Sequence, residues 1–160
     1  LVHFEPSDGA ELEQVIRAVV ISEVVGDSAL TLGRCERAVV RDCDVSQILA
    51  GHSCIDVRDT VIRGVAGKPG DGAGFSVVSF TGLKAVFRGC VIHVPVGGAG
   101  ALYARHAGRV DLRCVRSRIA LSDATQTVHH PAIYRHTALI DTDVSVAGPA
   151  PQGAAMPGVT

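Results

Sequence analysis

Hydrophobic and polar residues follow a six-residue pattern that recurs along this chain. The pattern is an apolar residue, two residues of any kind, a small residue (Cys, Thr or Ser), one further residue, and then Val or Ile. It occupies residues 40–45, 57–62, 87–92, 114–119 and 139–144, with a weaker copy at residues 19–24. Copies that put the same residue types in the same slots at unequal spacing indicate a stacked solenoid.

The spacing of the copies favours strands over helices. The small-residue slot falls at positions 22, 43, 60, 90, 117 and 142, so successive copies lie 17 to 30 residues apart. Helical solenoids repeat at roughly 33–47 residues, whereas short segments rich in Val, Ile and Thr are typical of strands. We therefore predict an all-β parallel β-helix of about five to six coils, with strands of neighbouring coils about 4.8 Å apart.

Stacking the copies aligns like residues in columns. The columns are Ala38, Ile55, Ala85, Leu112 and Thr137; Val45, Ile62, Ile92, Ile119 and Val144; and the small residues Cys43, Thr60, Cys90, Ser117 and Thr142. The position before each small residue holds Asp42, Asp59, Gly89, Arg116 or Asp141. Asp and Gly tolerate a left-handed backbone, so this slot predicts a tight bend between two strands, although Arg116 departs from the pattern.

Two stretches carry a family resemblance. Ala38-Val-Val-Arg-Asp-Cys43-Asp-Val45 and Ala85-Val-Phe-Arg-Gly-Cys90-Val-Ile92 resemble coils of the right-handed parallel β-helix superfamily of pectate and pectin lyases and phage tailspikes. The resemblance covers roughly residues 19–146 and implies a single-stranded, right-handed β-helix. Within that superfamily, pectate lyases use a carboxylate cluster for Ca²⁺ and an Arg as base, glycosidases use paired carboxylates, and virion proteins commonly form homotrimers.

The chain length is typical of one domain, and its ends differ from the repeats. Residues 8–18 predict a short helix that caps the stack, with Asp8 as N-cap and Glu11 completing a capping box. The tail is rich in Ala, Gly and Pro, which exclude a helix or a central strand. The expected division is an N-terminal segment with its capping helix (1–18), a parallel β-helix (19–146) and an extended tail (147–160).

Composition narrows the possible partners. A net charge of −1 and a pI of about 6.7 argue against nonspecific nucleic-acid binding, which needs a concentrated basic face. The chain has no run of 18 apolar residues, so we expect no membrane span, and its first residues lack the features of a signal peptide.

The five cysteines have no CxxC spacing. We expect them to act as small buried side chains, with Cys35 and Cys54 nearer a surface.

Three longer insertions, residues 63–74, 93–100 and 120–130, each begin just after the Val/Ile column and should form one side of the protein. Loops held by a rigid scaffold are frequent binding sites. The candidate binding residues on these loops are Lys68, Asp71, His93, Asp123, His129 and His130. The adjacent His129 and His130 point to opposite faces of an extended segment, which is poor chelate geometry. The favoured prediction is no metal site and no cofactor, with a site completed by His93 from the neighbouring loop as the alternative.

Outward positions on one strand face supply a second candidate site. Arg41, Arg58 and Arg88 follow the first apolar slot in three successive copies. They form either a solvated sheet face or a track for an anion or acidic polysaccharide, because guanidinium forks match carboxylates. Asp42 and Asp59 lie one coil apart, near the separation of paired glycosidase carboxylates. They are weak catalytic candidates because the bend gives Asp a backbone role.

Outward aliphatic residues predict a partner surface. They are Val39, Val61, Val86, Val91, Val115 and Ile140. The favoured interpretation is a non-enzymatic structural or binding β-helix that self-associates as a trimer, as a capsid-decoration or tail accessory protein of a phage virion. The alternative is a small polysaccharide lyase or glycoside hydrolase acting on an acidic polysaccharide. A third possibility is a cytoskeletal or periplasmic β-helix stacking end to end, against which the expected capping helix argues.

Overall fold

The structure is a computed structural model that describes residues 15–67, 73–79, 82–104, 110–130 and 137–147, together with the backbone of residues 2–4. Within these residues every regular element is a β-strand and there is no helix. No helix suited to crossing a membrane therefore occurs in this part of the chain.

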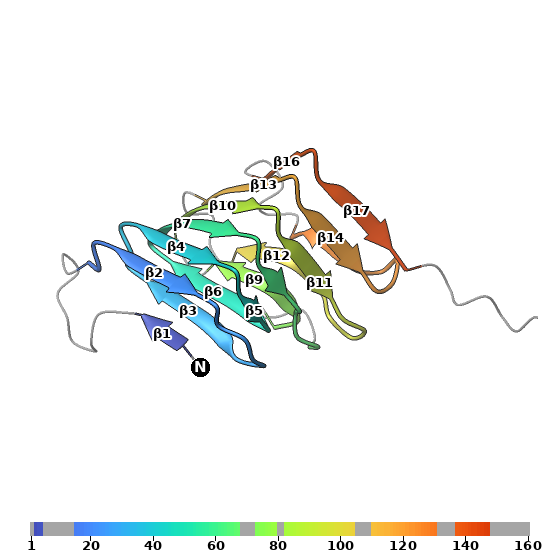
Figure 1. Cartoon of the computed structure of the whole chain (residues 1–160). Helices are drawn as coiled ribbons and strands as arrows, with labels where there is room; N and C mark the ends of the chain where they lie inside the picture. Colours follow the sequence, from blue (N-terminus) through green and yellow to red (C-terminus); the bar gives the residue numbers. More distant parts are fainter. Residues whose placement is uncertain are drawn as a thin grey trace, which may run out of the picture.

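The strands pair in parallel and form three sheets (Figure 1). The first sheet contains β1 (Val2–Phe4), β3 (Ala29–Gly33), β6 (Gln47–Gly51), β9 (Phe75–Ser79), β12 (Gly100–Ala104) and β15 (Thr127–His129). The second sheet contains β2 (Val19–Ser22), β4 (Ala38–Arg41), β7 (Ser53–Arg58), β10 (Leu83–Arg88), β13 (Val110–Val115) and β16 (Thr137–Ile140). The third sheet contains β5 (Asp44–Val45), β8 (Val61–Ile62), β11 (Val91–Val94), β14 (Arg118–Leu121) and β17 (Asp143–Val146).

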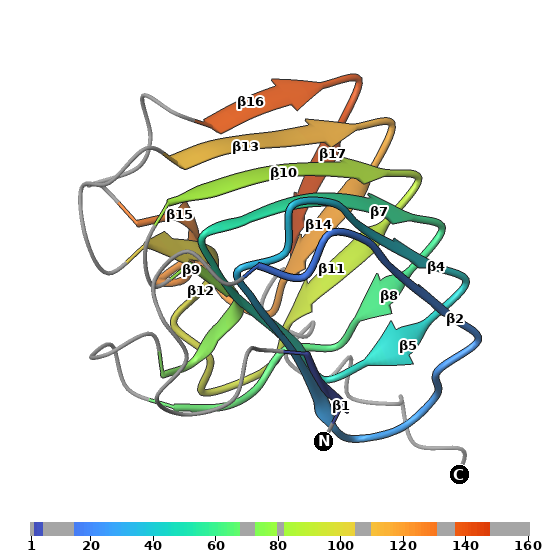
Figure 2. The same cartoon turned by 90° about the vertical axis from the view of Figure 1, so that its left-hand side faces the viewer.

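From β4 onward the chain passes through the second, third and first sheets in a repeating cycle. We call one such cycle a circuit. Figure 2 shows the three sheets arranged around a common interior. This arrangement is consistent with a parallel β-helix.

The predicted alignment of the repeats is confirmed. In the second sheet, Ala38 pairs with Ile55, Ile55 with Ala85, and Ala85 with Leu112. The β-branched column is continuous in the third sheet from Val45 to Val144. The first sheet adds a column that the repeats did not reveal, formed by Leu30, Ile48, Val77 and Leu102. These inward columns form one buried aliphatic core.

The weak first copy has a different register from the predicted one. Ile21 occupies the slot predicted for Val19, because Ile21 is the residue that pairs with Val40. The small-residue slot consequently falls on Val24 and not on Ser22. The isolated bridge between Val25 and Asp44 agrees, because it puts Val24 opposite the small residue Cys43. Val19 and Ile21 are both apolar and lie on the same face of the strand, two positions apart. The six-residue pattern can therefore begin at either of them.

Every bend between the second and third sheets has a left-handed backbone. The bend residues are Glu23, Asp42, Asp59, Gly89, Arg116 and Asp141, with φ between 46° and 62°. The prediction from Asp and Gly is therefore confirmed, and it extends to Arg116, although this conformation costs most L-residues roughly 1–2 kcal/mol. A second row of left-handed residues, Arg34, His52 and Gly82, precedes strands of the second sheet.

The small residue after each bend turns its side chain back onto the backbone. Thr60 Oγ1 donates to the carbonyl of Arg58 at 2.7 Å and accepts the N–H of Cys43, in the preceding circuit, at 3.4 Å. Ser117 Oγ likewise donates to a carbonyl two residues earlier at 3.0 Å and accepts the N–H of Cys90 at 3.2 Å. The slot therefore favours a small side chain with a donor, which explains why Cys, Thr and Ser recur there, and Val24 in the weak first copy is the exception.

The predicted N-terminal helix is not confirmed. Residues 8–14 of the predicted helix lie outside the described residues, and residues 15–18 are not helical. Ile16 instead forms an isolated parallel bridge with Cys35. The predicted N-terminal segment also contains strand β1, which pairs with β3.

Arg63 links three circuits on the outside of the third sheet. Its Nη1 lies 2.8 Å from Asp27 Oδ1, and its Nη2 donates to the carbonyl of Gly26 at 2.9 Å. Its Nε lies 2.7 Å from Asp44 Oδ1, an ionic contact without hydrogen-bond geometry. The side chain thus spans from β8 past β5 to the segment before β3.

The C-terminal end of the core is open among the described residues. Leu139, Val144 and Val146 occupy inward columns, yet they are 40%, 43% and 48% exposed. Their partners in the preceding circuit, among them Cys114 and Ile119, are buried. The strands β16 and β17 are also the last in their sheets. Residues 148–160 of the predicted tail lie outside the described residues.

The Thr60 hydroxyl should contribute strongly to stability, because the side chain is only 1% exposed. Replacing it in Thr60→Val leaves a buried N–H and a buried carbonyl with one partner fewer, which typically costs about 1–3 kcal/mol. Thr60→Ser keeps the hydroxyl and should lose only the contribution of one methyl group, about 1 kcal/mol. Urea unfolding of both variants measures the difference. A valine variant as stable as the serine variant would exclude the proposed hydroxyl role.

Candidate functional site

The three predicted outward arginines stand in one column. Arg41 pairs with Arg58 across β4 and β7, and Arg58 pairs with Arg88 across β7 and β10. The strand residues just before them, Val40, Val57 and Phe87, are buried, so the arginines project from the outer face of the second sheet. Neighbouring parallel strands lie about 4.8 Å apart. The arrangement places three guanidinium stems side by side across three circuits.

Asp56 orients two of these arginines. It accepts a hydrogen bond from Arg58 Nε at 3.0 Å and a second from Nη2 of the same guanidinium. Arg88 Nε lies 3.4 Å from the other carboxylate oxygen, an ionic contact without hydrogen-bond geometry. The hydrogen bond from Arg58, with a further contribution from Arg88, lowers the pKa of Asp56. The carboxylate therefore stays ionised and holds both arginines in place.

A surface hollow of about 610 Å³ lies where this column meets the bend between the second and third sheets. It is lined by Arg58, Asp59, Arg88, Gly89 and Arg116. Three arginines and one carboxylate residue thus line this hollow. Sequence reasoning found the first two arginines but missed Arg116, because it treated that residue only as an exception to the bend pattern.

The catalytic candidates Asp42 and Asp59 both lie on left-handed bends of adjacent circuits, with exposed side chains. Their predicted backbone role is therefore confirmed. A catalytic role for this pair stays a prediction.

The three insertions lie on one side of the molecule, as predicted. Gly67 N–H donates to the carbonyl of Gly97 at 2.8 Å, which joins the first insertion to the second. Gln126 Nε2 donates to the carbonyls of Pro95 at 2.7 Å and Gly98 at 3.1 Å, which joins the third to the second. One backbone hydrogen bond and two hydrogen bonds from the Gln126 side chain thus join the described parts of the loops into a packed layer.

The candidate residues on these loops that the structure describes lie in separate surroundings. His93 is exposed on β11 of the third sheet, and Asp123 accepts hydrogen bonds from Thr125 that lower the pKa of the carboxyl group. Lys68 and Asp71 lie outside the described residues. Within the part of the chain that the structure describes, no group of His, Cys, Asp and Glu is arranged to hold a metal ion.

His129 and His130 belong to different environments. His129 pairs with Leu102 in an inward column, and burial lowers the pKa of its imidazole. His130 packs against Tyr103 and Phe75, with its ring centroid 5.0 Å from that of Tyr103 and 6.3 Å from that of Phe75. The predicted divergence of the two side chains agrees with these contacts.

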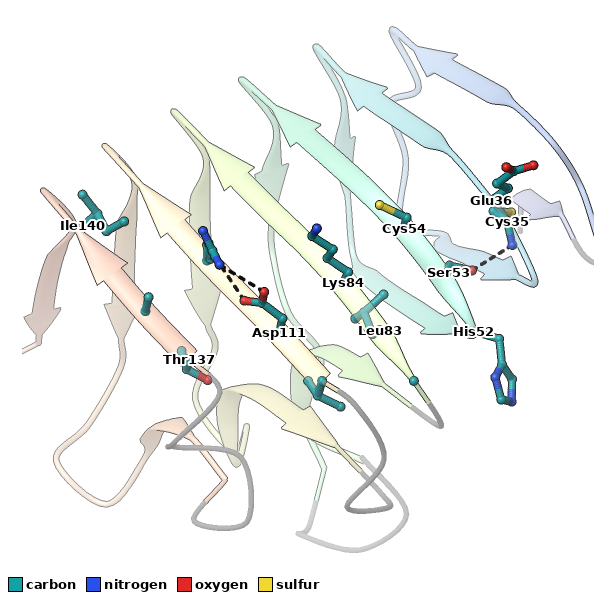
Figure 3. A pocket seen from close by; sticks show the side chains of 14 residues that line it. Cys35, Glu36, His52, Ser53, Cys54, Leu83, Lys84, Asp111, Thr137 and Ile140 are labelled. Carbon is teal, nitrogen blue, oxygen red and sulfur yellow. Dashed lines mark hydrogen bonds and ion pairs between the residues drawn. The ribbon is translucent and has the colours of Figure 1, made fainter.

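A shallow groove of about 860 Å³ runs along the start of the second-sheet strands (Figure 3). Figure 3 shows Cys54, Lys84 and Asp111 on its surface, and these residues pair across β7, β10 and β13. Asp111 forms an ion pair with Arg113, with a distance of 3.1 Å between Oδ1 and Nε. Sequence reasoning did not identify this groove, because these residues differ in type from one circuit to the next.

The five cysteines are free, and only Cys54 is exposed. Burial raises the pKa of the Cys90 thiol to about 11 and that of Cys114 to about 12. The prediction that Cys35 lies near a surface is wrong. Cys35 follows the left-handed Arg34, and its N–H donates to Ser53 Oγ at 3.0 Å, so it occupies a buried small-residue slot at the second row of bends.

Comparison with known proteins found no matching family model, no matching curated protein and no matching solved structure.

Native-state alkylation should modify Cys54 alone, because reaction requires both access and a thiolate. Iodoacetamide treatment followed by mass spectrometry should therefore add one group quickly, and the other four only after unfolding. Cys54→Ser should remove the fast reaction. A second cysteine that reacts at a comparable rate in the native protein would contradict the burial described above.

Proposed function

We propose that this protein is a non-enzymatic binding module that carries an acidic polysaccharide on the outer face of its second sheet. Its scaffold would be a right-handed β-helix of five to six coils, similar to the pectin lyase-like and tailspike superfamily. The observation that carries the proposal is the column formed by Arg41, Arg58 and Arg88. Like charges directly opposite one another on neighbouring strands destabilise a sheet. A sheet face that only contacts water gains nothing from such a column, so its presence favours a binding role.

The geometry of the column favours an extended ligand. Three arginines repeating about every 4.8 Å suit a polymer that crosses the strands and presents anionic groups at similar intervals. Guanidinium groups bind carboxylates through paired hydrogen bonds. Asp56 already holds two of the arginines, so less side-chain freedom is lost on binding.

Self-association is the second part of the proposal. The outward residues Val39, Val61, Val86, Val91 and Val115 are half-buried, and Ile140 is 46% exposed. Aliphatic side chains on an outer sheet face are suited to packing against other copies. A homotrimer acting as a capsid-decoration or tail accessory protein of a phage virion is the assembly that the tailspike resemblance implies.

Removing one arginine of the column should weaken polymer binding. Arg41→Gln should reduce the affinity for polygalacturonate about fivefold, equivalent to roughly 1 kcal/mol for an exposed charge pair. Arg118→Gln removes the same charge from an exposed position on the third sheet and is the matched control. Affinities measured by calorimetry at two salt concentrations test this, because binding through exposed charges must weaken with salt.

If both variants lost the same affinity, the loss would reflect the net charge of the protein and not the arginine column. If the unmodified protein did not bind the polymer, the polysaccharide proposal would be refuted. New reducing or unsaturated ends in the incubated polymer would favour the lyase or glycosidase alternative instead.

The mass in solution should correspond to a trimer of the 16.6 kDa chain. Ile140→Asp should shift it toward the monomer, because a charge on the outward aliphatic face opposes packing between copies. Val96→Asp places the same charge at a residue that is 79% exposed in a loop and is the control. Light scattering after size exclusion measures both, and a monomeric unmodified protein would refute the trimer.

A further inference from the structure

The hollow beside the arginine column is built by three consecutive circuits. Arg58 and Arg88 pair across β7 and β10, and Arg88 pairs in turn with Val115 on β13. The residue that follows β13 is Arg116, whose left-handed backbone places it on the bend beside Gly89. Arginines from three circuits therefore line one concave surface.

The arginines of the hollow retain capacity for a ligand. Asp56 occupies both Nε and Nη2 of Arg58, which leaves Nη1 of that guanidinium. Among the described residues, the ion pair of Arg88 is its 3.4 Å contact with Asp56, which lacks hydrogen-bond geometry. Arg116 forms no ion pair with any residue that the structure describes. Asp59 is the one carboxylate in the lining, and Asp56 neutralises part of the charge of Arg58 and Arg88, so three arginines against these two carboxylates leave an excess of positive charge. Such a concave, charged surface concentrates anions.

Gly89 keeps the hollow open. It is the only glycine among the six bend residues of this row, whose other members are Asp, Glu or Arg. A Cβ atom at Gly89 would lie 2.5 Å from Asp59 Oδ1. A side chain at this position would therefore press on the Asp59 carboxylate and take up space at the wall of the hollow that Gly89 lines.

The volume indicates more than a single ion. At about 610 Å³ the hollow falls within the range of about 300–1,000 Å³ typical of small-ligand sites. An inorganic oxyanion alone would leave most of it to water. A sugar ring that carries an oxyanion group would use both the charge and the volume.

We propose that the hollow bounded by Arg58, Arg88 and Arg116 above Gly89 binds one sugar-acid unit, with its oxyanion group held by the three guanidinium groups. The identity of the polymer rests on the proposed function, whereas the site itself rests on the geometry of the hollow. The oxyanion is either a uronate carboxylate or a sulfate ester, and the two sources are distinguished by the probe.

Two substitutions at Gly89 form a matched test. Asp occupies the same bend slot at Asp42, Asp59 and Asp141, and Asn shares its tolerance of a left-handed backbone. Gly89→Asp and Gly89→Asn fill the same space and differ only in charge. Gly89→Asp should reduce the affinity for the oligosaccharide at least tenfold, and Gly89→Asn by a clearly smaller factor.

The probes are an oligogalacturonate hexamer and a heparin-derived hexasaccharide, with affinities measured by calorimetry. Arginine Nε–H resonances should shift for Arg58, Arg88 and Arg116 on titration. Binding of the galacturonate alone assigns a carboxylate, and binding of the heparin fragment alone assigns a sulfate ester. If Gly89→Asp does not fold, Arg116→Asn takes its place and should lower the affinity for the oligosaccharide at least fivefold. Arg118→Gln is the control and should bind with unchanged affinity.

Contrary outcomes separate the two proposals. Unchanged binding in Gly89→Asp together with weakened binding in Arg41→Gln would overturn the hollow and leave the arginine column standing. Equal losses in Gly89→Asp and Gly89→Asn would overturn the anion-specific site, because only the filled volume would matter. Resonance shifts with inorganic sulfate but with neither oligosaccharide would reduce the hollow to an adventitious ion site, and no oligosaccharide binding at all would overturn both proposals.

Discussion

The stack depends on one local device, a left-handed bend followed by a small donor side chain. At Thr60 the hydroxyl binds the carbonyl two residues earlier and the N–H of the preceding circuit. One residue therefore fixes the turn of its own circuit and the register with its neighbour. Because a shift of one residue in a strand reverses its inward and outward faces, this register determines which side chains reach the surface.

The arginine column is a consequence of that register and also carries an energetic cost. Aligned strands place Arg41, Arg58 and Arg88 opposite one another, and like charges in such positions repel. Asp56 offsets part of the repulsion through its contacts with two of them. Arg116 adds a further guanidinium next to the column with no ion pair among the described residues to offset it, which is why the proposed binding site is placed at the hollow.

The columns could be predicted from sequence because strand periodicity and bend chemistry leave their mark on every circuit. The first repeat was misaligned because Val19 and Ile21 fit the same apolar slot equally well. Arg63 could not be predicted to reach Asp27, since the two residues are 36 positions apart and share no motif. Gly89 was recognised as a bend residue, but its second role, leaving space beside the arginines, depends on neighbours from two other circuits.

The outer column changes character along the stack. It is basic at Arg41, Arg58 and Arg88 and becomes aliphatic at Val115 and Ile140. The hollow lies at this boundary, and beyond it the inward residues of β16 and β17 are also exposed. Of the outward aliphatic residues on the second sheet, Val39 and Val86 share strands with Arg41 and Arg88, whereas Val115 and Ile140 lie beyond the arginines. An assembly that packed through Val115 and Ile140 would leave the arginines uncovered, so that several copies could hold one long acidic chain together.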